Sequence, residues 1–377
     1  MSPDPVNKLL EWLALSLTPG LGIRSWNKLL AVFDGPQQVL ETDQSRIRKL
    51  VPGIRANIIA GINKEKLLAA AEKEIECAAG LGIEIITREQ EAYPELLRHI
   101  DDPPILLYVK GNASLLQSAC IGVVGARAAS VYGQRIAEDL SKRLCQRGLT
   151  VVSGLALGID AAAHKGALQA SGATLAVLGC GLDVVYPRQN RSLYEEIACR
   201  GALVSEYRLG ALPEAFRFPA RNRIISGLSL GVVVVEAARK SGSLITADYA
   251  LEQGREVFAV PGRIDSCKSE GTHRLLQEGA KLVHTVNDIV EELSFPAVVY
   301  NASSLSCQPD GENAALTEEE KVFFAYLDVY PQTIDEITRQ SRMTVQKVSE
   351  LLLMLELKGL IESLPGNQYQ KRRPASV

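Results

Sequence analysis

Phosphate-binding chemistry is indicated by arginines and small hydroxyl residues on either side of a short apolar run. Arg217, Arg221 and Arg223 precede four consecutive valines, Val232–Val235, and the turn Ser241-Gly242-Ser243 follows them. Four valines in a row are typical of a strand buried on both faces of a parallel sheet, and such sheets bind ligands beyond the carboxyl ends of their strands. A small-residue turn that opens a helix offers free backbone N–H groups, and arginine makes forked hydrogen bonds to phosphate. The pattern therefore predicts a ligand that carries phosphates.

Arginine is concentrated in the middle of the chain, although the protein as a whole is slightly acidic. Between Val185 and Arg223 there are seven arginines, no lysine and four glutamates, in a chain with a net charge of -3. A solvated surface would accept lysine equally well, so the absence of lysine favours contacts that need the planar guanidinium group. Arg127 lies in the turn after an earlier apolar run and adds a positive group at the expected ligand-binding edge.

Residues suited to catalysis are scarce. Asp160 and His164 are four residues apart, which places them on one face of a helix where the carboxylate could orient a base; a local helix contact or cap explains the same spacing. Ser153 and Ser241 both precede glycine in turns. The four histidines are scattered and the seven cysteines include no C-x-x-C pair, so we predict no metal site, no cofactor and no catalytic residues.

Length and composition indicate a folded protein of several domains. A chain of 377 residues with 46% hydrophobic content predicts two or three domains. No run of about 18 apolar residues occurs, and the N-terminal segment lacks the charged-then-apolar pattern of a signal peptide. We therefore expect a cytoplasmic protein with reduced thiols and no membrane partner.

The elements that must position the arginines alternate between strand-like and helical runs in residues 91–293. This alternation predicts a Rossmann-like α/β core, a doubly wound parallel sheet with helices on both faces. The predicted strands cover residues 106–109, 120–124, 150–152, 174–178, 202–204, 232–235, 257–260 and 281–283.

This sheet is not predicted to bind a dinucleotide or to hydrolyse ATP. The turn from Gly125 to Gly133 contains no G-x-G-x-x-G pattern, and the second strand ends in Ser153-Gly154, where a dinucleotide-binding protein has an acidic residue. A P-loop pattern is also absent from the sequence.

Residues 1–90 are predicted to form a helical domain of the SAM-like or helix-hairpin-helix type. The segment Leu17–Ile23 contains Gly20-Leu21-Gly22 between two apolar helical runs, and Val51–Ile54 is a weaker copy. This arrangement resembles the hairpin of helix-hairpin-helix domains, whose backbone amides can meet a phosphate. A plain helical turn that uses the left-handed conformation of glycine is the alternative, and such modules also act as protein-binding adaptors.

A polar, turn-rich linker, residues 294–316, is predicted to lead to a winged-helix domain, residues 317–371. Thr317-Glu-Glu-Glu320 predicts a capped first helix, two further helices cover 333–340 and 344–357, and 358–369 is predicted to form a hairpin. Winged helices commonly read duplex DNA. From Thr317 to Val377, however, eight basic residues stand against nine acidic ones, whereas a phosphate-binding surface should be basic. We expect a protein-contact or regulatory role.

Six ordered motifs resemble those of the DNA-processing protein A family (DprA, also called Smf). The resemblance covers about Tyr93 to Val283. Two segments upstream of the six motifs, Tyr93–Ile100 and Asp102–Gly111, belong to the same pattern. The flanking domains are similar to the helical and winged-helix domains of longer members. The six motifs are Gly122–Arg127, Val152–Ala156 with Gly158–His164, Leu178–Asp183 with Tyr186-Pro187, Phe218–Ile225, Ser241–Ala247 and Val260–Gly262.

The resemblance implies a cytoplasmic bacterial protein that binds single-stranded DNA and is not an enzyme. It implies that the protein loads the RecA recombinase onto the strand, protects incoming DNA in natural transformation and helps to displace single-strand-binding protein. It also implies a homodimer formed through the Rossmann-like domain.

The family's phosphate pocket maps onto Arg127, onto Arg188 after Tyr-Pro, and onto Arg221-Asn222-Arg223, with Ser241-Gly242-Ser243 at its rim. The family often has lysine after Tyr-Pro; arginine keeps the charge. We expect these arginines to project from loops at one edge of the sheet. Arg223 is also expected to pair with Glu236, because both lie near the end of one strand.

Two further expectations concern base stacking and assembly. Sequence-independent binding of single strands normally adds aromatic stacking platforms to a basic groove. Tyr194 is our candidate for such stacking, because Tyr186 is expected to be structural. The family's dimer contact falls on the predicted helix 272–278, where Leu275 and Leu276 are candidates and at least one should face the protomer's own core.

Two alternative functions remain open at this point. One is a nucleotide-processing enzyme related to nucleoside-monophosphate phosphoribohydrolases, which use a P-G-G-x-G-T-x-x-E loop. Ser241–Ala247 has no acid four residues after a Gly-Gly pair, although Glu236 could substitute. The other is a winged-helix transcriptional repressor, for which deletion of residues 317–377 would abolish DNA binding.

Overall fold

The chain is described by a computed structural model that covers residues 5–293, 317–328, 332–341, 343–358, 360–364 and 368–371. It divides into two compact units, Met1–Val299 and Tyr300–Val377. The predicted linker, residues 294–316, lies outside the described residues.

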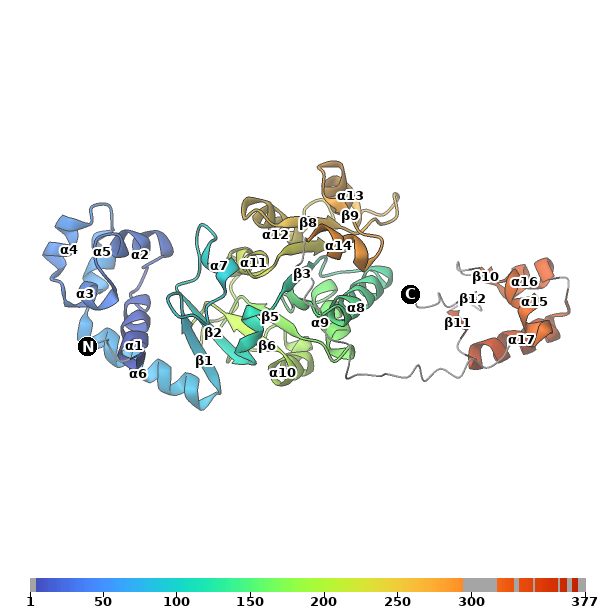
Figure 1. The fold of residues 1–377 in the computed structure, drawn as a ribbon, viewed down its shortest axis with the longest axis horizontal. Helices are drawn as coiled ribbons and strands as arrows, with labels where there is room; N and C mark the ends of the chain where they lie inside the picture. The colour runs from blue at the N-terminus through green and yellow to red at the C-terminus, as the bar shows by residue number, and fades with distance from the viewer. Residues whose placement is uncertain are drawn as a thin grey trace. The chain divides into compact units, whose positions relative to one another are not determined.

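A nine-stranded sheet forms the core of the first unit (Figure 1), in the order β1-β2-β6-β5-β4-β3-β7-β8-β9. Neighbouring strands from β6 to β9 are parallel, and β2 is antiparallel to both β6 and β1. The predicted Rossmann-like sheet is confirmed, with two antiparallel strands added at one edge. The strands are β1 (Ile83–Thr87), β2 (Leu106–Gly111), β3 (Cys120–Val124), β4 (Thr150–Ser153), β5 (Thr174–Leu178), β6 (Ala202–Ser205), β7 (Gly231–Val234), β8 (Glu256–Ala259) and β9 (Lys281–Leu282).

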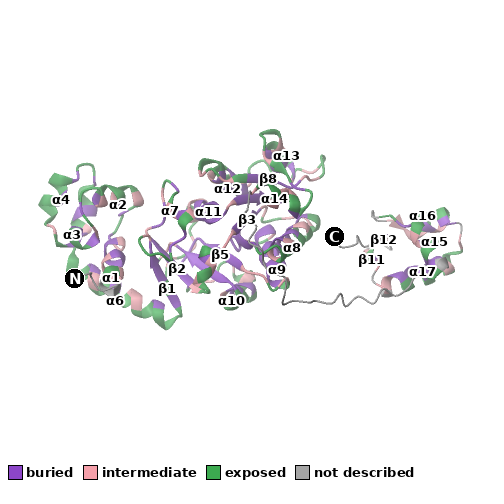
Figure 2. Cartoon of the chain, in the orientation of Figure 1, coloured by how far each residue is buried: buried purple, intermediate pink, exposed green. Residues whose placement is uncertain are grey.

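The central strands are buried on both faces, as their continuous apolar sequences require (Figure 2). Every residue of β3, β4, β5, β6 and β7 is buried. Side chains that alternate along the strands contribute to separate apolar clusters on opposite faces of the sheet. One face packs against α7 (Glu95–Arg98), α11 (Arg217–Leu228), α12 (Gly242–Glu252) and α13 (Glu270–Gln277); the other packs against α8 (Val131–Gln146), α9 (Ile159–Gln169), α10 (Arg191–Arg200) and α14 (Val286–Glu292).

The order of the parallel strands creates a topological switch point beside β3. The chain proceeds from β3 to β4, β5 and β6 on one side, and later to β7, β8 and β9 on the other side. Segments that leave β3 and β7 therefore diverge, which opens a crevice at the carboxyl ends of these strands. The loops that follow β3, β4 and β7 carry Arg127, Gly154 and the Ser241 turn.

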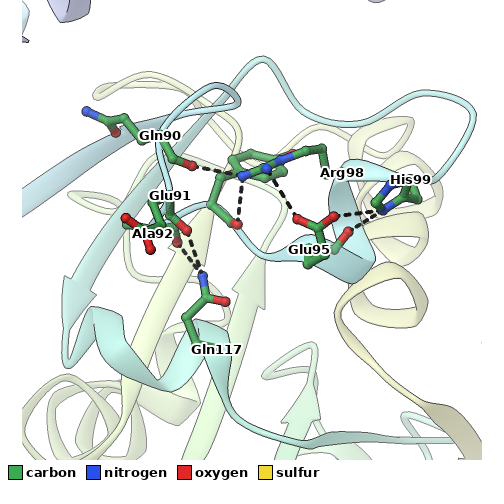
Figure 3. A network of polar contacts seen from close by, with 8 residues as sticks. Gln90, Glu91, Ala92, Glu95, Arg98, His99 and Gln117 are labelled. Carbon is green, nitrogen blue, oxygen red and sulfur yellow. Dashed lines mark hydrogen bonds and ion pairs between the residues drawn. The ribbon is translucent and has the colours of Figure 1, made fainter.

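Helix α11 is supported by the segment that connects β1 to β2. In the polar network of Figure 3, Arg98 Nη2 donates hydrogen bonds to the carbonyl of Gln90, at 2.8 Å, and to that of Tyr93, at 3.2 Å. Helix α7 of this segment packs closely on α11, because a Cβ on Gly227 would lie 2.6 Å from Leu97 Cδ1. The helix that carries Arg221 and Arg223 is thereby held near its C-terminal end.

The N-terminal residues are helical, as predicted. Trp12 and Trp26 are fully buried, with ring centroids 5.2 Å apart, and join the first two helices. The turns at Leu17–Ile23 and Val51–Ile54 each connect two helices, as expected. Strand β1 lies inside the range that we assigned to this domain, so the sheet begins earlier than predicted. The helices are α1 (Pro5–Ser16), α2 (Ile23–Leu30), α3 (Pro36–Glu41), α4 (Gln44–Leu50), α5 (Ala56–Gly61) and α6 (Lys64–Gly80).

The second unit has the predicted winged-helix elements around a small core that includes Phe323, Ile337 and Leu355. Thr317 and Glu320 form the expected capping box of the first helix. Its elements are α15 (Glu318–Tyr326), β10 (Gln332–Thr333), α16 (Ile334–Ser341), α17 (Val345–Leu357), β11 (Ile361–Leu364) and β12 (Gln368–Lys371), with β12 between β10 and β11. Across both units, none of the helices described is long and apolar enough to cross a bilayer.

Candidate nucleic-acid interface

The loop that carries Arg127 is fixed by the carboxylate and the backbone of Glu236. Ser130 donates to this carboxylate from its backbone N–H, at 3.0 Å, and from its hydroxyl. The same Ser130 oxygen accepts from Gly133 N at 2.9 Å and so caps α8. Ala126 N donates to the Glu236 carbonyl at 2.7 Å. These contacts join the ends of β3 and β7, and they leave the Arg127 side chain exposed.

Arg221 lies beneath this loop, at the ends of β4 and β5. Its Nη1 donates to the carbonyl of Gly154, at 2.7 Å, and to that of Val177, while Nε donates to Asn222 Oδ1 at 3.2 Å. A Cβ on Gly154 would lie 2.4 Å from the guanidinium nitrogens, so only glycine allows this approach. The side chain is 4% exposed. Burial lowers the pKa of Arg221, and the charge of Asp160 opposes that shift.

A cleft of about 520 Å³ opens above Arg221 at the switch point. A smaller hollow of about 80 Å³ adjoins it, and Arg127, Phe218 and Arg221 line both. Lys240 and the Ser241-Gly242-Ser243 turn form another part of the cleft wall. Arg127 and Lys240 are exposed, and neither has an ion-pair partner among the described residues. Asp160 is the one acidic residue in the lining, so the cleft carries an excess of positive charge suited to phosphate.

An aromatic pair borders the smaller hollow. The rings of Tyr186 and Phe218 have centroids 5.4 Å apart and planes tilted by 36°, and the Arg127 guanidinium carbon lies 5.4 Å from the Phe218 centroid. Tyr186 is 39% exposed. From the sequence we expected Tyr186 to be structural, and we assigned no role to Phe218. Tyr186 lies two residues before Arg188 and Phe218 three residues before Arg221, and this closeness to the predicted arginines is the signal that could have identified them.

Tyr194 cannot serve as the stacking platform that we expected. It is 5% exposed, lies in α10 against the sheet, and donates its hydroxyl hydrogen to the Leu182 carbonyl. Burial raises the pKa of Tyr194 to about 12, and Cys180 and Asp183 add to the shift. The sequence places a tyrosine near Arg188, but only the helical phase of α10 decides that this ring faces inward.

Arg223 is part of an internal ion cluster, and the expected pair with Glu236 is wrong. Its Nη2 lies 2.5 Å from Glu206 and its Nε lies 3.1 Å from Asp102, with the side chain 9% exposed. Arg221 and Arg223 project from a helix and not from loops, so residues two apart point in different directions. Arg223 lines neither hollow, and its charge is already paired.

The other predicted site residues lie on α11, at the start of α12 and in a short 3-10 turn. Asn222 lines the cleft and donates from Nδ2 to the Gly242 carbonyl at 3.2 Å, which links α11 to the start of α12. Ser241 caps α12 by accepting from Ser243 N at 3.4 Å, and the two hydroxyl oxygens are 2.8 Å apart. Arg188 is exposed in a short 3-10 turn, two residues from Tyr186, and lines neither hollow. We retain Arg188 as a candidate beside the aromatic pair.

Asp160 and His164 are placed for structure. Asp160 Oδ2 accepts from Gly154 N, at 3.2 Å, and from Ala156 N, at 3.4 Å; burial raises the pKa of Asp160, and Arg221 opposes the shift. His164 is fully buried, and its Nδ1 is 2.7 Å from Thr174 Oγ1. Burial, with a further contribution from Arg221, lowers the pKa of His164 to about 3. Within the described ranges, no group of His, Cys, Asp and Glu is placed to hold a metal ion.

Comparison with known proteins decides the family. A family model described as DNA recombination-mediator protein A matches residues 84–294, and one described as the DprA winged helix domain matches residues 308–367. Protein Smf of Escherichia coli is 44% identical over 299 residues, which are 78% of this chain and 79% of that protein. The chain belongs to the DNA recombination-mediator protein A family, called DprA or Smf.

Solved structures of DprA proteins share the fold. The structure of DNA processing protein A from Streptococcus pneumoniae has a TM-score of 0.68 and 40% identity, and the match covers 76% of this chain and 98% of that one. A structure from Helicobacter pylori, titled for its single-stranded DNA binding mode, has a TM-score of 0.51 and 31% identity over 56% of this chain and 95% of that one.

Helix α13, which we expected to contribute to a DprA dimer, presents one of its two leucines outward. Leu275 is 5% exposed and belongs to the core, whereas Leu276 is half-buried at the edge of the same cluster. The structure thus distinguishes the two candidates. Leu275 packs in the core of its own protomer, and Leu276 stays a candidate for the dimer contact.

Proposed function

We propose that this protein binds single-stranded DNA, without sequence preference, in the cleft between the ends of β3 and β7. The observation that carries the proposal is the juxtaposition of an exposed, unpaired Arg127 with the Tyr186–Phe218 pair at the mouth of a cationic cleft. A phosphodiester backbone can contact Arg127, Lys240 and the polar Ser241 turn while a base stacks on the aromatic pair. The reported single-stranded DNA binding of the Helicobacter pylori relative supports this assignment.

The strand is favoured over the duplex because of its flexibility. The phosphates of a single strand can enter a recess while their bases turn toward an aromatic surface, whereas a stacked and paired duplex exposes no base face. The cleft carries few groups that would read base edges, so affinity should depend on salt more than on sequence.

We further propose a role as a binding protein and not as an enzyme. Asp160, His164 and Glu236, the groups considered for catalysis, all hold other parts of the fold through hydrogen bonds, and all three are buried. The repressor alternative is not favoured, because the exposed cations and the aromatic pair that suit a single strand lie at the sheet edge and not in the winged helix. The family description, a recombination mediator, supports the proposal that the bound strand is handed to RecA, with displacement of single-strand-binding protein, during transformation or recombination.

The central test compares the native protein with Arg127→Glu on a labelled single strand and on a blunt duplex. The native protein should prefer the single strand, and Arg127→Glu should weaken that binding at least tenfold, or by about 1.4 kcal/mol. Lys142→Glu is the matched control, because Lys142 is exposed on α8 and outside the cleft lining. Equal effects of Arg127→Glu and Lys142→Glu on strand binding would contradict the proposed site.

The finer role has its own assay. RecA filament formation on a strand coated with single-strand-binding protein should start faster when the native protein is added. Arg127→Glu should lose this effect, while Lys142→Glu should keep it. An unchanged rate with native protein would remove the RecA role without affecting the binding proposal.

A further inference from the structure

A second concentration of positive charge lies in the N-terminal helical domain, far along the chain from the cleft residues. Between Gly22 and Arg55 there are six basic residues and three acidic ones. All six basic side chains are exposed, and none has an ion-pair partner among the described residues. The acidic Glu41, in contrast, is paired with Lys64 at 3.0 Å. The six are Arg24, Lys28, Arg46, Arg48, Lys49 and Arg55.

Three of these cations are brought together around the turn between α4 and α5. A Cβ on Gly53 would lie 3.2 Å from Lys28 Nζ, so the lysine of α2 extends over this turn. Arg55 is two residues from Gly53, which limits the distance between their Cα atoms to about 7 Å. Arg24 precedes Lys28 by one helical turn and shares its face of α2. We call Arg24, Lys28 and Arg55 the hairpin patch.

The two helix–turn–helix pairs pack reciprocally, which gives the domain an approximate internal symmetry. The first turn lies against α5: a Cβ on Gly20 would be 3.6 Å from Ile58, and one on Gly61 would be 3.4 Å from Pro19. The second turn lies against α2 through Lys28. Gly20 and Gly53 occupy equivalent places in the two turns, with φ of 77° and 86°. Each turn is thus supported by the second helix of the other pair.

We propose that the hairpin patch is a second nucleic-acid site, which binds the backbone of double-stranded DNA. Unpaired, exposed cations gain most from a dense row of phosphates, because each contact releases condensed counterions. Two turns related by approximate symmetry match a ligand with two symmetry-related backbones, and a duplex has such backbones whereas a single strand does not. The proposal goes beyond the single-strand cleft and does not depend on it.

The proposed site predicts a preference for junctions. One chain that holds a single strand in its cleft and a duplex at the hairpin patch should bind a tailed duplex more tightly than either part alone, because the second contact becomes intramolecular. Such a substrate has the form of a resected end or of a strand newly paired along part of its length.

The test uses the full-length protein with a 20-nucleotide strand, a blunt 20-base-pair duplex and a duplex with a 20-nucleotide tail, at about 50 mM salt. Lys28→Glu/Arg55→Glu should weaken binding of the blunt duplex roughly tenfold and reduce tailed-duplex affinity to that of the strand, while strand affinity stays the same. Arg127→Glu should have the opposite pattern. The control is Lys73→Glu/Lys142→Glu, which changes the same charge at two exposed lysines outside the patch.

Several outcomes would overturn the proposal. Duplex affinity that the patch variant leaves unchanged would do so, as would an equal loss on strand and duplex or no gain from adding a duplex to a tail. If the added duplex gave no gain in affinity, an acidic protein surface would be the better partner for the hairpin patch. Lys28→Gln/Arg55→Gln, which removes charge without reversing it, guards against misfolding and should show the same pattern at smaller size. A failure of Arg127→Glu to weaken strand binding would count against the cleft and not against the patch.

Discussion

At the scale of single residues, aromatic stacking should separate Tyr186 from Tyr194. Tyr186→Ala should weaken single-strand binding by about 1–3 kcal/mol, the usual contribution of one stacked base. Tyr186→Phe should keep most of the affinity, because the ring and not the hydroxyl makes the contact. Fluorescence anisotropy with a labelled strand measures both.

Tyr194→Phe is the matched control for that experiment. It removes the buried hydrogen bond to the Leu182 carbonyl, so it should lower stability by about 1 kcal/mol and leave affinity unchanged. A large loss of affinity in Tyr194→Phe, with none in Tyr186→Ala, would restore the assignment that the sequence suggested.

The two neighbouring arginines of α11 should also differ. Arg223→Ala leaves the partly buried Glu206 carboxylate without its 2.5 Å partner, so we expect a loss of up to about 3 kcal/mol in the free energy of unfolding. Strand affinity of the folded protein should hardly change. Urea unfolding and anisotropy on the same sample test this, and Arg127→Ala should behave in the reverse manner. An affinity loss in Arg223→Ala as large as that in Arg127→Ala would return Arg223 to the DNA site.

The types and order of the residues predicted which of them lie near the candidate site. They did not predict the direction in which each side chain points. Arg127 and the Ser241 turn lie where the sequence indicated, because they follow buried strands directly. Arg221 and Arg223 could not be told apart from sequence, since their roles depend on how α11 is rotated over the sheet.

At the scale of elements, Glu236 acts by joining β7 to the loop after β3. Glu236→Ala should loosen the Gly125–Ser130 loop and weaken strand binding severalfold, together with a loss of about 1–3 kcal/mol in stability. The direction of the change in affinity separates two effects. Loss of a negative charge near phosphate would by itself strengthen strand binding, so weaker binding would show that the loop has lost its support. Anisotropy of Glu236→Ala against Glu252→Ala, an exposed glutamate of α12, measures the effect.

If Glu236→Ala binds the strand more tightly than the native protein, the loop is not held by this carboxylate in any way that matters for DNA. Glu236→Gln retains one acceptor for Ser130 and should lie between the native protein and the alanine variant.

His164 in α9 should make the folded state sensitive to acid. Thr174 Oγ1 gives its hydrogen to the Val151 carbonyl at 2.8 Å. His164 Nδ1 therefore donates to Thr174 Oγ1, and the imidazole ring is neutral. Because the pKa is lowered to about 3 in the fold, stability is complete above about pH 6.5 and declines as the unfolded chain takes up its proton between pH 6.5 and 3. The slope from this group is at most about 1.4 kcal/mol per pH unit.

Urea midpoints at pH 7, 5 and 4 test this expectation. His164→Gln should be less stable at pH 7 but should lose less on acidification. His284→Gln, at an exposed histidine, should follow the native curve. A parallel decline in the His164 variant would assign the acid sensitivity to other groups.

Element prediction failed mainly at β1. Residues 83–87 are short and follow a long helix directly, and their strand character depends on pairing with β2, which starts beyond a loop. Strands whose apolar residues are continuous, such as β3 and β7, need no such partner to be recognised.

At the scale of the whole molecule, assembly should depend on α13. Leu276→Arg places a charge at a half-buried position and should give folded monomers that bind long strands more weakly but very short strands almost as well, since only long strands bridge two clefts. Light scattering and anisotropy on strands of two lengths provide the measurements. Leu275→Arg is a contrasting variant that should fail to fold, because Leu275 is in the core. An intact dimer of Leu276→Arg would place the interface elsewhere.

The succession of a helical part, an α/β part and a winged helix was predictable, because each part has its own periodicity and capping signals. The approximate symmetry inside the first domain was only partly visible, as two short glycine-containing turns. Their mutual packing joins residues as far apart as Pro19 and Gly61 and could be seen only in the folded chain.

Because Arg221 is buried in the wall of the cleft, we expect ligand binding there to stabilise the folded protein. The Arg221 guanidinium is shielded from water and donates to the Gly154 and Val177 carbonyls and to the Asn222 amide oxygen. The negative charge nearby is the Asp160 carboxylate. Burial of this cation opposes folding, and an anion bound in the cleft should offset part of that effect. Anions should therefore act as a thermal protectant of this core, and a protein purified free of polyanions should melt earlier than one that retains them.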